Sequence, residues 1–317
     1  MNRSGPVAAT PRLGISLALT AALISGVSIF LNGHAVRHFD DSAVFTAAKN
    51  SLVGVVIVAA LLRPATMQEA RALPRATLLK LGTIAVVGGS IPFILFFEGL
   101  SQATAANAAF IQKTLFIWVA LLAVPLLGER LGPGHLLAIG VLLLAQVLIG
   151  RPAEASFGSG ELMILAATLL WAVETVIARQ VLRGVSASIG VAARMGGGAL
   201  VLFCYLAVTG KASDLFGFDA EQWRWLLLTA AFLVAYVSTW YGALKLAPAT
   251  AVTCVLTVAA PLTAALQIWD GRPMPDAERL AGYSLLMVGV ALTAVLAWRA
   301  GRDRGQAGAL EAAGGGA

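Results

Sequence analysis

Ten apolar stretches, separated by short polar segments, run through most of the chain. Each is close to the roughly 20 residues that an α-helix needs to cross the hydrocarbon core of a bilayer. Backbone polar groups in lipid must find partners within their own segment, so each stretch is expected to be a helix. The uninterrupted apolar run at 52–62 also differs from the short alternating strands of a membrane β-barrel. The predicted spans are 13–31, 42–62, 77–97, 104–126, 134–150, 160–180, 186–209, 223–245, 249–269 and 279–299.

The composition excludes a water-soluble fold. Of 317 residues, 59% are hydrophobic and 12% are charged, and a soluble domain carries about twice that charged share. So little polar surface could not cover a soluble core. Soluble enzymes and nucleic-acid-binding modules are therefore excluded, and the short connections leave no soluble domain for chemistry.

The basic residues predict the orientation. The chain has 22 Lys and Arg against 16 Asp and Glu. Loops that share a face with the N-terminus carry about twice as many Lys and Arg as the other loops, and basic loops stay cytoplasmic. Both termini are therefore predicted to be cytoplasmic. We expect a multi-pass protein of the bacterial inner membrane whose first stretch, too long for a signal peptide, is retained.

The two halves of the chain are related by an internal repeat. A shift of 144 or 145 residues places Ala47-Ala48-Lys49 on Ala192-Ala193-Arg194, early in the second helix of each half. Five helices per half is an odd number, so the second copy enters the membrane from the opposite side. The predicted fold is an all-α membrane protein of ten transmembrane helices, built as two inverted five-helix repeats, an arrangement common in secondary transporters. The expected division is a cytoplasmic tail at 1–12, repeats at 13–150 and 151–299, and a disordered cytoplasmic tail at 300–317.

Several short motifs resemble one transporter family. Residues 119–131 read VALLAVPLLGERL, which resembles the end of an EamA-type repeat of the drug/metabolite transporter superfamily. Trp171-Ala172 and the run AAPLTAA at 259–265 resemble parts of the second repeat. The resemblance covers roughly 13–299 and implies a ten-helix transporter of small metabolites. The second repeat departs from the pattern at Asp270-Gly271-Arg272, where a Gly-Glu-Arg turn is expected.

Charged residues inside the spans are the first site candidates, because a charge within a bilayer is costly and usually faces a cavity. Lys113 would attract a substrate carboxylate or another anionic group, pair with an acid across the cavity, or form a fixed structural ion pair. Glu174 would serve as a proton-coupling acid, or as a static partner of Arg194 or Lys113. For Lys49 and Arg194, snorkelling or a structural tie competes with substrate contact. For Glu129, a turn-fixing pair with Arg130 is favoured over a substrate contact.

Polar and aromatic residues complete the candidate set. Gln112 and Asn107 add hydrogen-bonding capacity to the fourth span, and Trp171, Tyr236 and Trp240 are expected to line a cavity. Pro92 and Pro261 are expected to kink their helices and free backbone carbonyls. The substrate-binding or coupling candidates are Lys113, Glu174, Arg194, Lys49, Trp171, Gln112, Asn107, Tyr236 and Trp240.

The predicted function is secondary active transport of a small metabolite such as an amino acid, by alternating access with a central cavity between the repeats. The family resemblance implies export. No catalytic residue, metal or cofactor is expected. The expected partners are the small-molecule substrate, the lipid bilayer and protons as a candidate coupling ion, with no nucleic acid and the oligomeric state left open. Two alternatives are multidrug or lipophilic-cation efflux, which requires a net acidic cavity, and an intramembrane lipid-modifying enzyme.

Overall fold

The computed structural model describes residues 11–61, 63–151 and 158–314. All the regular secondary structure in this part of the chain is helical, and it contains no strand. It contains ten helical segments long and apolar enough to span a membrane, as the sequence predicts. These spans are Arg12–His38, Ser42–Leu61, Arg75–Gln102, Asn107–Leu127, Pro133–Gly150, Ser159–Leu182, Ala187–Val208, Ala220–Leu246, Ala249–Trp269 and Ala277–Ala300.

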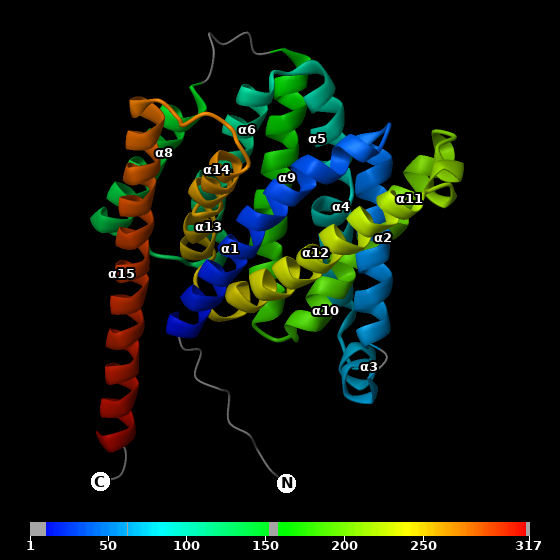
Figure 1. Ribbon diagram of the computed structural model, residues 1–317. Coiled ribbons are helices and arrows are strands. Elements are labelled where there is room, and N and C mark those ends of the chain that lie inside the picture. The colour runs from blue at the N-terminus through cyan, green and yellow to red at the C-terminus, as the bar shows by residue number, and fades with distance from the viewer. Residues whose placement is uncertain (1–10, 62, 152–157, 315–317) are drawn as a thin grey trace.

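Several spans consist of more than one helix (Figure 1). The first half comprises α1 (Pro11–Ala35), η1 (Val36–His38), α2 (Ser42–Leu61), α3 (Pro64–Arg71), α4 (Arg75–Gly89), α5 (Ile91–Gln102), α6 (Ala105–Lys113), α7 (Leu115–Leu127) and α8 (Pro133–Gly150). The second half comprises α9 (Ser159–Leu182), α10 (Ala187–Ala192), η2 (Ala193–Gly197), α11 (Gly198–Val208), η3 (Ala212–Phe216), α12 (Ala220–Leu246), α13 (Ala249–Leu256), α14 (Ala259–Trp269) and α15 (Ala277–Gly314).

The fourth span of each half is broken at the same point. Thr114 separates α6 from α7, and its hydroxyl donates to the carbonyl of Ile111 at 2.6 Å. Thr257 lies between α13 and α14, and its hydroxyl donates to the carbonyl of Cys254 at 2.7 Å. Each threonine also donates its backbone N–H to that same carbonyl. The breaks lie about one repeat length apart, so the repeat extends from the order of the helices to their local geometry.

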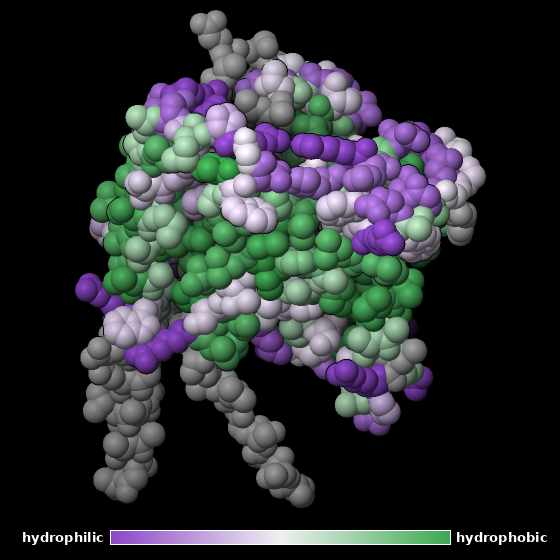
Figure 2. Space-filling model, in the orientation of Figure 1, coloured by the Kyte–Doolittle hydropathy of each residue, from purple (hydrophilic) through white to green (hydrophobic). Residues whose placement is uncertain are grey.

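The bundle has two faces, set by the even number of spans. We call the face at which α1 begins the terminal face, and the other the opposite face. The last spans of the two halves, α8 and α15, pack against each other at one side of the bundle (Figure 1). On the face shown in Figure 2, hydrophobic side chains form a band across the middle, with hydrophilic residues above and below it. This band is the surface that lipid would cover.

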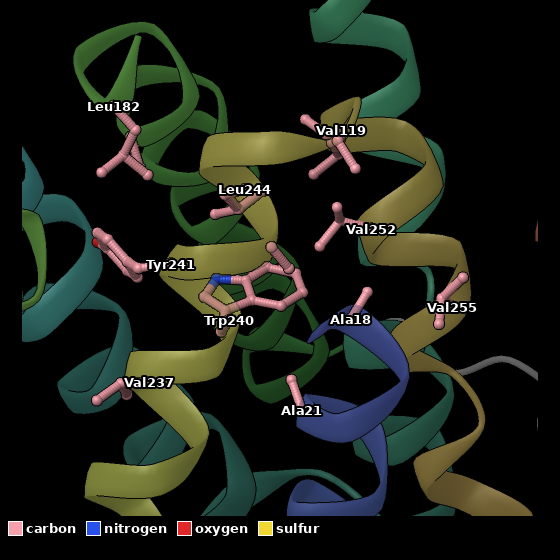
Figure 3. Packing of buried hydrophobic residues seen from close by; sticks show 14 of the residues in the cluster. Ala18, Ala21, Val119, Leu182, Val237, Trp240, Tyr241, Leu244, Val252 and Val255 are labelled. Atoms are coloured by element: carbon pink, nitrogen blue, oxygen red, sulfur yellow. The ribbon is translucent and has the colours of Figure 1, made fainter. Parts of the chain in front are cut away.

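The apolar core lies mainly in the half of the bundle toward the terminal face. There one cluster joins nearly all the spans, and Trp240 and Leu244 of α12 pack beside Ala18 of α1 and Val252 of α13 (Figure 3). Toward the opposite face the buried apolar residues form three separate small clusters, centred on Phe45, Leu202 and Ile164. The spans are therefore sealed together at the terminal face and less tightly joined at the opposite face.

The last helix continues into the expected C-terminal tail. The last helix, α15, extends through residues 300–314, part of the stretch expected to be disordered. That stretch contains several Ala residues, which favour helix. Residues 1–10 and 315–317, the rest of the two expected tails, lie outside the described residues.

Candidate functional site

A π-helical turn interrupts the seventh span and carries Arg194. This turn, η2, lies between α10 and α11. Glycines bring neighbouring backbones close to it: a Cβ on Gly89 would lie 2.1 Å from the carbonyl oxygen of Arg194, and one on Gly198 would lie 2.5 Å from that of Gly89. Single π-turns inside α-helices occur frequently at functional sites. The hydropathy pattern does not predict this turn. The run of glycines at 196–198 is the one sequence feature that coincides with it.

Arg194 meets Glu174 and Tyr241 in a buried polar cluster. Arg194 Nη1 donates to Glu174 Oε2 at 3.2 Å, and the Tyr241 hydroxyl donates to Glu174 Oε1 at 2.5 Å. The Glu174 side chain is 1% exposed and that of Arg194 is 11% exposed. Of the two partners left open for Glu174, the structure brings Arg194 to it. Tyr241 is absent from the predicted set, because a tyrosine in an apolar helix gives no sign of which carboxylate it will meet.

The third span bends beside this cluster. Pro92 has no N–H to donate to the carbonyl of Gly88, one helical turn earlier. The indole Nε1 of Trp171 donates to that carbonyl at 3.3 Å. Gly88 also packs against Glu174, since a Cβ there would lie 2.2 Å from Glu174 Cγ. The predicted kink thus positions Trp171, whose ring also contacts Phe93 at 5.4 Å between centroids.

Lys113 lies at the break in the fourth span. It is the last residue of α6, and its half-buried side chain forms no hydrogen bond or ion pair with the described part of the chain. A cation at a helix C-terminus gains from the negative end of the helix dipole, but that gain is small beside the cost of a charge in a bilayer. Gln112, the preceding residue, likewise has no hydrogen bond from its side chain within the described ranges.

Asn107 and Lys49 form ties between helices. Asn107 Nδ2 donates to Glu161 Oε1 at 3.2 Å, which joins the start of α6 to the start of α9. Lys49 Nζ donates to Asn32 Oδ1 at 2.8 Å and lies 4.8 Å from the centre of the Phe45 ring. Lys49 and Arg194, equivalent in the repeat, therefore have different partners.

The aromatic residues of α12 divide between the core and the polar cluster. Trp240 is 2% exposed and belongs to the main apolar core. Tyr236 is half-buried, stacks on Trp240 at 6.3 Å, and lies close enough to Arg194 for electrostatic interaction.

Glu129 has a different partner from the one predicted. Its carboxylate accepts the backbone N–H of Ala249 at 2.6 Å and that of Thr250 at 3.2 Å, and so caps the start of α13. The expectation of a turn-fixing pair with Arg130 is corrected. The first N–H groups of a helix lack partners within it and form the positive end of its dipole, so they attract a carboxylate strongly. Gly128, at φ 69°, ends α7 in the left-handed conformation and places Glu129 there.

The equivalent turn of the second repeat lacks this carboxylate. Gly271, at φ 91°, ends the ninth span in a left-handed conformation, as Gly128 ends the fourth. The residue that follows is Arg272, and a cation cannot cap the N-terminus of a helix. Asp270 of this turn instead pairs with His34 at 3.0 Å. Among the described residues, the turn of the second repeat therefore supplies no carboxylate that caps a helix, unlike Glu129 at the terminal face.

In the described part of the chain, no group of three or more His, Cys, Asp or Glu residues is placed to hold a metal ion.

Two inverted five-helix repeats, with broken fourth spans and charges buried between helices, define a membrane transporter. The chain belongs to the EamA-like transporter family, whose match extends over residues 12–151 and 158–295. A protein of Archaeoglobus fulgidus, described only as an uncharacterized transporter, is 26% identical over 222 residues, 68% of this chain and 75% of that protein. One solved crystal structure is similar with a TM-score of 0.73 and 19% identity, over 90% of this chain and 98% of the other, a likeness of fold.

Proposed function

We propose that this transporter is a secondary active exporter of a small metabolite that carries an anionic group, with amino acids as the leading class. The observation that carries the proposal is Lys113, a charged side chain at the break within the fourth span that has no hydrogen bond or ion pair in the part of the chain that the structure describes. On insertion scales a Lys at the centre of a span costs about 2.5–3.5 kcal/mol. A substrate carboxylate at this point would supply the missing partner.

Alternating access between the repeats is the proposed mechanism. The core packing toward the terminal face and the Glu129 cap on α13 both favour a state sealed at that face. The charge asymmetry of the loops supports a cytoplasmic terminal face, which makes this state outward-facing. Return to the inward-facing state would require Glu129 to release α13, and the broken fourth spans provide the hinges.

Protons are the proposed coupling ion, and Glu174 is the group proposed to carry them. It is the buried acid of the polar cluster, and its charge is balanced by Arg194 in this state. Movement of the seventh span would separate Arg194 from Glu174, and a carboxylate left alone in an apolar environment takes up a proton. Proton uptake would then be tied to the conformational change.

Lipophilic-cation efflux is the weaker candidate. It needs a net acidic cavity, whereas here Arg194 neutralises Glu174 and the unpaired Lys113 leaves a net positive charge. Lipid modification has still less support, because the family is one of transporters.

The test is transport by the purified chain in proteoliposomes, with a panel of amino acids and related compounds, with and without a pH gradient. Lys113→Met should abolish transport of the substrate that the screen identifies and leave the protein monodisperse. Lys80→Met is the matched control, because Lys80 is exposed and donates to Gln180 near the terminal face. Wild-type transport by Lys113→Met, or transport only of lipophilic cations, would refute the proposal.

A further inference from the structure

A pocket opens at the opposite face, between α2, α5 and α11. Its volume is about 230 Å³. Figure 1 shows α2 and α11 side by side at this edge of the bundle. The residues that argue for its chemistry are Asp41, Thr46, Phe97, Glu98, Tyr205 and Lys211.

Two of the charged residues that line the pocket, Asp41 and Lys211, form an ion pair with each other. Lys211 Nζ donates to Asp41 Oδ2 at 2.5 Å, and Asp41 Oδ1 accepts the backbone N–H of Ala43 at 2.7 Å. Partial burial raises the pKa of Asp41, but the hydrogen bonds from Lys211 and the backbone outweigh this and hold it below its usual value. The same pair raises the pKa of Lys211. Asp41 and Lys211 therefore cancel each other's charge.

Glu98 supplies an uncompensated negative charge. Its Oε1 accepts a hydrogen bond from Gln102 Nε2 at 3.0 Å, and no cation reaches it from the residues that the structure describes. The hydroxyls of Thr46 and Tyr205, both lining the pocket, form no hydrogen bond within the same ranges. The pocket thus offers the Glu98 carboxylate and hydroxyls that have no hydrogen bond within the described residues.

The walls are apolar and aromatic. Phe97 and Tyr205 present rings, and Ile94 and Leu202 supply aliphatic surface. Aromatic faces attract cations as well as apolar groups, and the net charge of the lining is negative. This combination fits a molecule with an ammonium head and a compact apolar body, and it disfavours an anion.

We propose that this pocket is a binding site for small primary ammonium compounds, with Glu98 as the carboxylate that receives the ammonium group. The site stands on its own geometry. It is separate from Lys113, which lies at the break in the fourth span, and it does not depend on what the transporter carries.

The experiment measures equilibrium binding to the full chain in nanodiscs of zwitterionic lipid, with three probes that share one body. Phenethylamine should bind about fivefold to tenfold more tightly than the neutral 2-phenylethanol, and 3-phenylpropionate should bind most weakly. Glu98→Gln should abolish the preference for the amine, while its amide oxygen can still accept from Gln102. Lys211→Met should tighten amine binding several-fold, because it frees the charge of Asp41.

Two controls distinguish binding in this pocket from binding elsewhere on the protein. Glu221→Gln removes an exposed carboxylate of the same face outside the pocket, where Glu221 pairs with Arg224, and should leave binding unchanged. Lys113→Met should also leave it unchanged. The proposal would be overturned if the amine and the alcohol bind equally well to the wild type, or if Glu98→Gln keeps the wild-type preference for the amine. Weaker amine binding in Lys211→Met would also overturn it. An unchanged amine preference in Glu98→Gln, together with altered amine binding in Lys113→Met, would place the ligand in the central site and equally refute the proposal.

Discussion

The cap that Glu129 places on α13 offers a direct test of how the terminal face is held closed. The carboxylate accepts hydrogen bonds from two backbone N–H groups, at 2.6 and 3.2 Å. The N-cap residue of α13 itself is Pro248, whose side chain has no hydrogen-bond acceptor and cannot cap the helix. Glu129→Gln removes the charge but keeps one acceptor oxygen. We predict that this variant opens the terminal face more often than the wild type.

The size of the effect follows from the two contacts. A partly buried carboxylate at a helix N-terminus contributes up to about 2 kcal/mol, and charge-assisted hydrogen bonds are roughly twice as strong as neutral ones. Loss of the charge in Glu129→Gln should therefore cost the sealed state about 1–2 kcal/mol. That corresponds to roughly a fivefold to thirtyfold larger population of the open state.

A native cysteine reports this opening. Cys254 of α13 is 1% exposed, five residues after Ala249, whereas Cys204 is exposed. In a Cys204→Ser background, a membrane-permeant maleimide should label Cys254 at a rate proportional to the open population, provided that reclosing is faster than the reaction. Cys254 of Glu129→Gln should be labelled roughly fivefold to thirtyfold faster than Cys254 of the parent, and that of Glu129→Ala faster still.

The control is Glu221→Gln, an exposed carboxylate at the opposite face that contacts no part of α13. Its Cys254 labelling should match that of the parent. If Glu129→Ala labels no faster than the parent, or Glu221→Gln labels equally fast, the Glu129 carboxylate does not hold this face closed.

Three further predictions test the polar cluster and the ion pair between Asp41 and Lys211. Gly88→Ala should prevent folding, because its Cβ would lie 2.2 Å from Glu174 Cγ, whereas Gly82→Ala on the same helix meets open space and should fold normally, as size-exclusion chromatography will show. Glu174→Gln leaves Arg194 as a buried charge without a counter-ion and should destabilise the protein by about 3 kcal/mol or more, and the double variant Glu174→Gln/Arg194→Met should regain melting temperature. A single variant as stable as wild type would contradict this. The pKa of Asp41 in the folded protein lies below its usual value, so the ionised side chain should stabilise the protein above about pH 4 and lose that contribution as the pH falls through the folded pKa. The difference in melting temperature between wild type and Asp41→Asn should therefore be constant from about pH 5 to 8 and vanish in acid. A difference that grows below pH 4 would refute this prediction.

Much of the fold could be predicted because its determinants are local. A bilayer requires a long apolar run for each crossing, so ten runs predict ten spans. The repeat could also be predicted, since Lys49 and Arg194 occupy equivalent positions in two copies with an odd number of helices. The charges within spans, Lys113 and Glu174 among them, stand out because the bilayer makes each of them costly.

The partners of those charges depend on which helices become neighbours, and an apolar sequence hardly specifies that. Glu174 meets Arg194 where Gly88 lets the sixth span pack on the third span, and where Gly89 and Gly198 let the π-turn of the seventh span approach that same helix. Glu129 caps α13 rather than pairing with Arg130, because the free N–H groups of a distant helix lie within its reach. The sequence by itself therefore determined the class, the spans and the repeat through the length and polarity that a membrane imposes. The tertiary structure decided which charges are neutralised and which, like Lys113, have no partner among the described residues, because that depends on side chains meeting across separate helices.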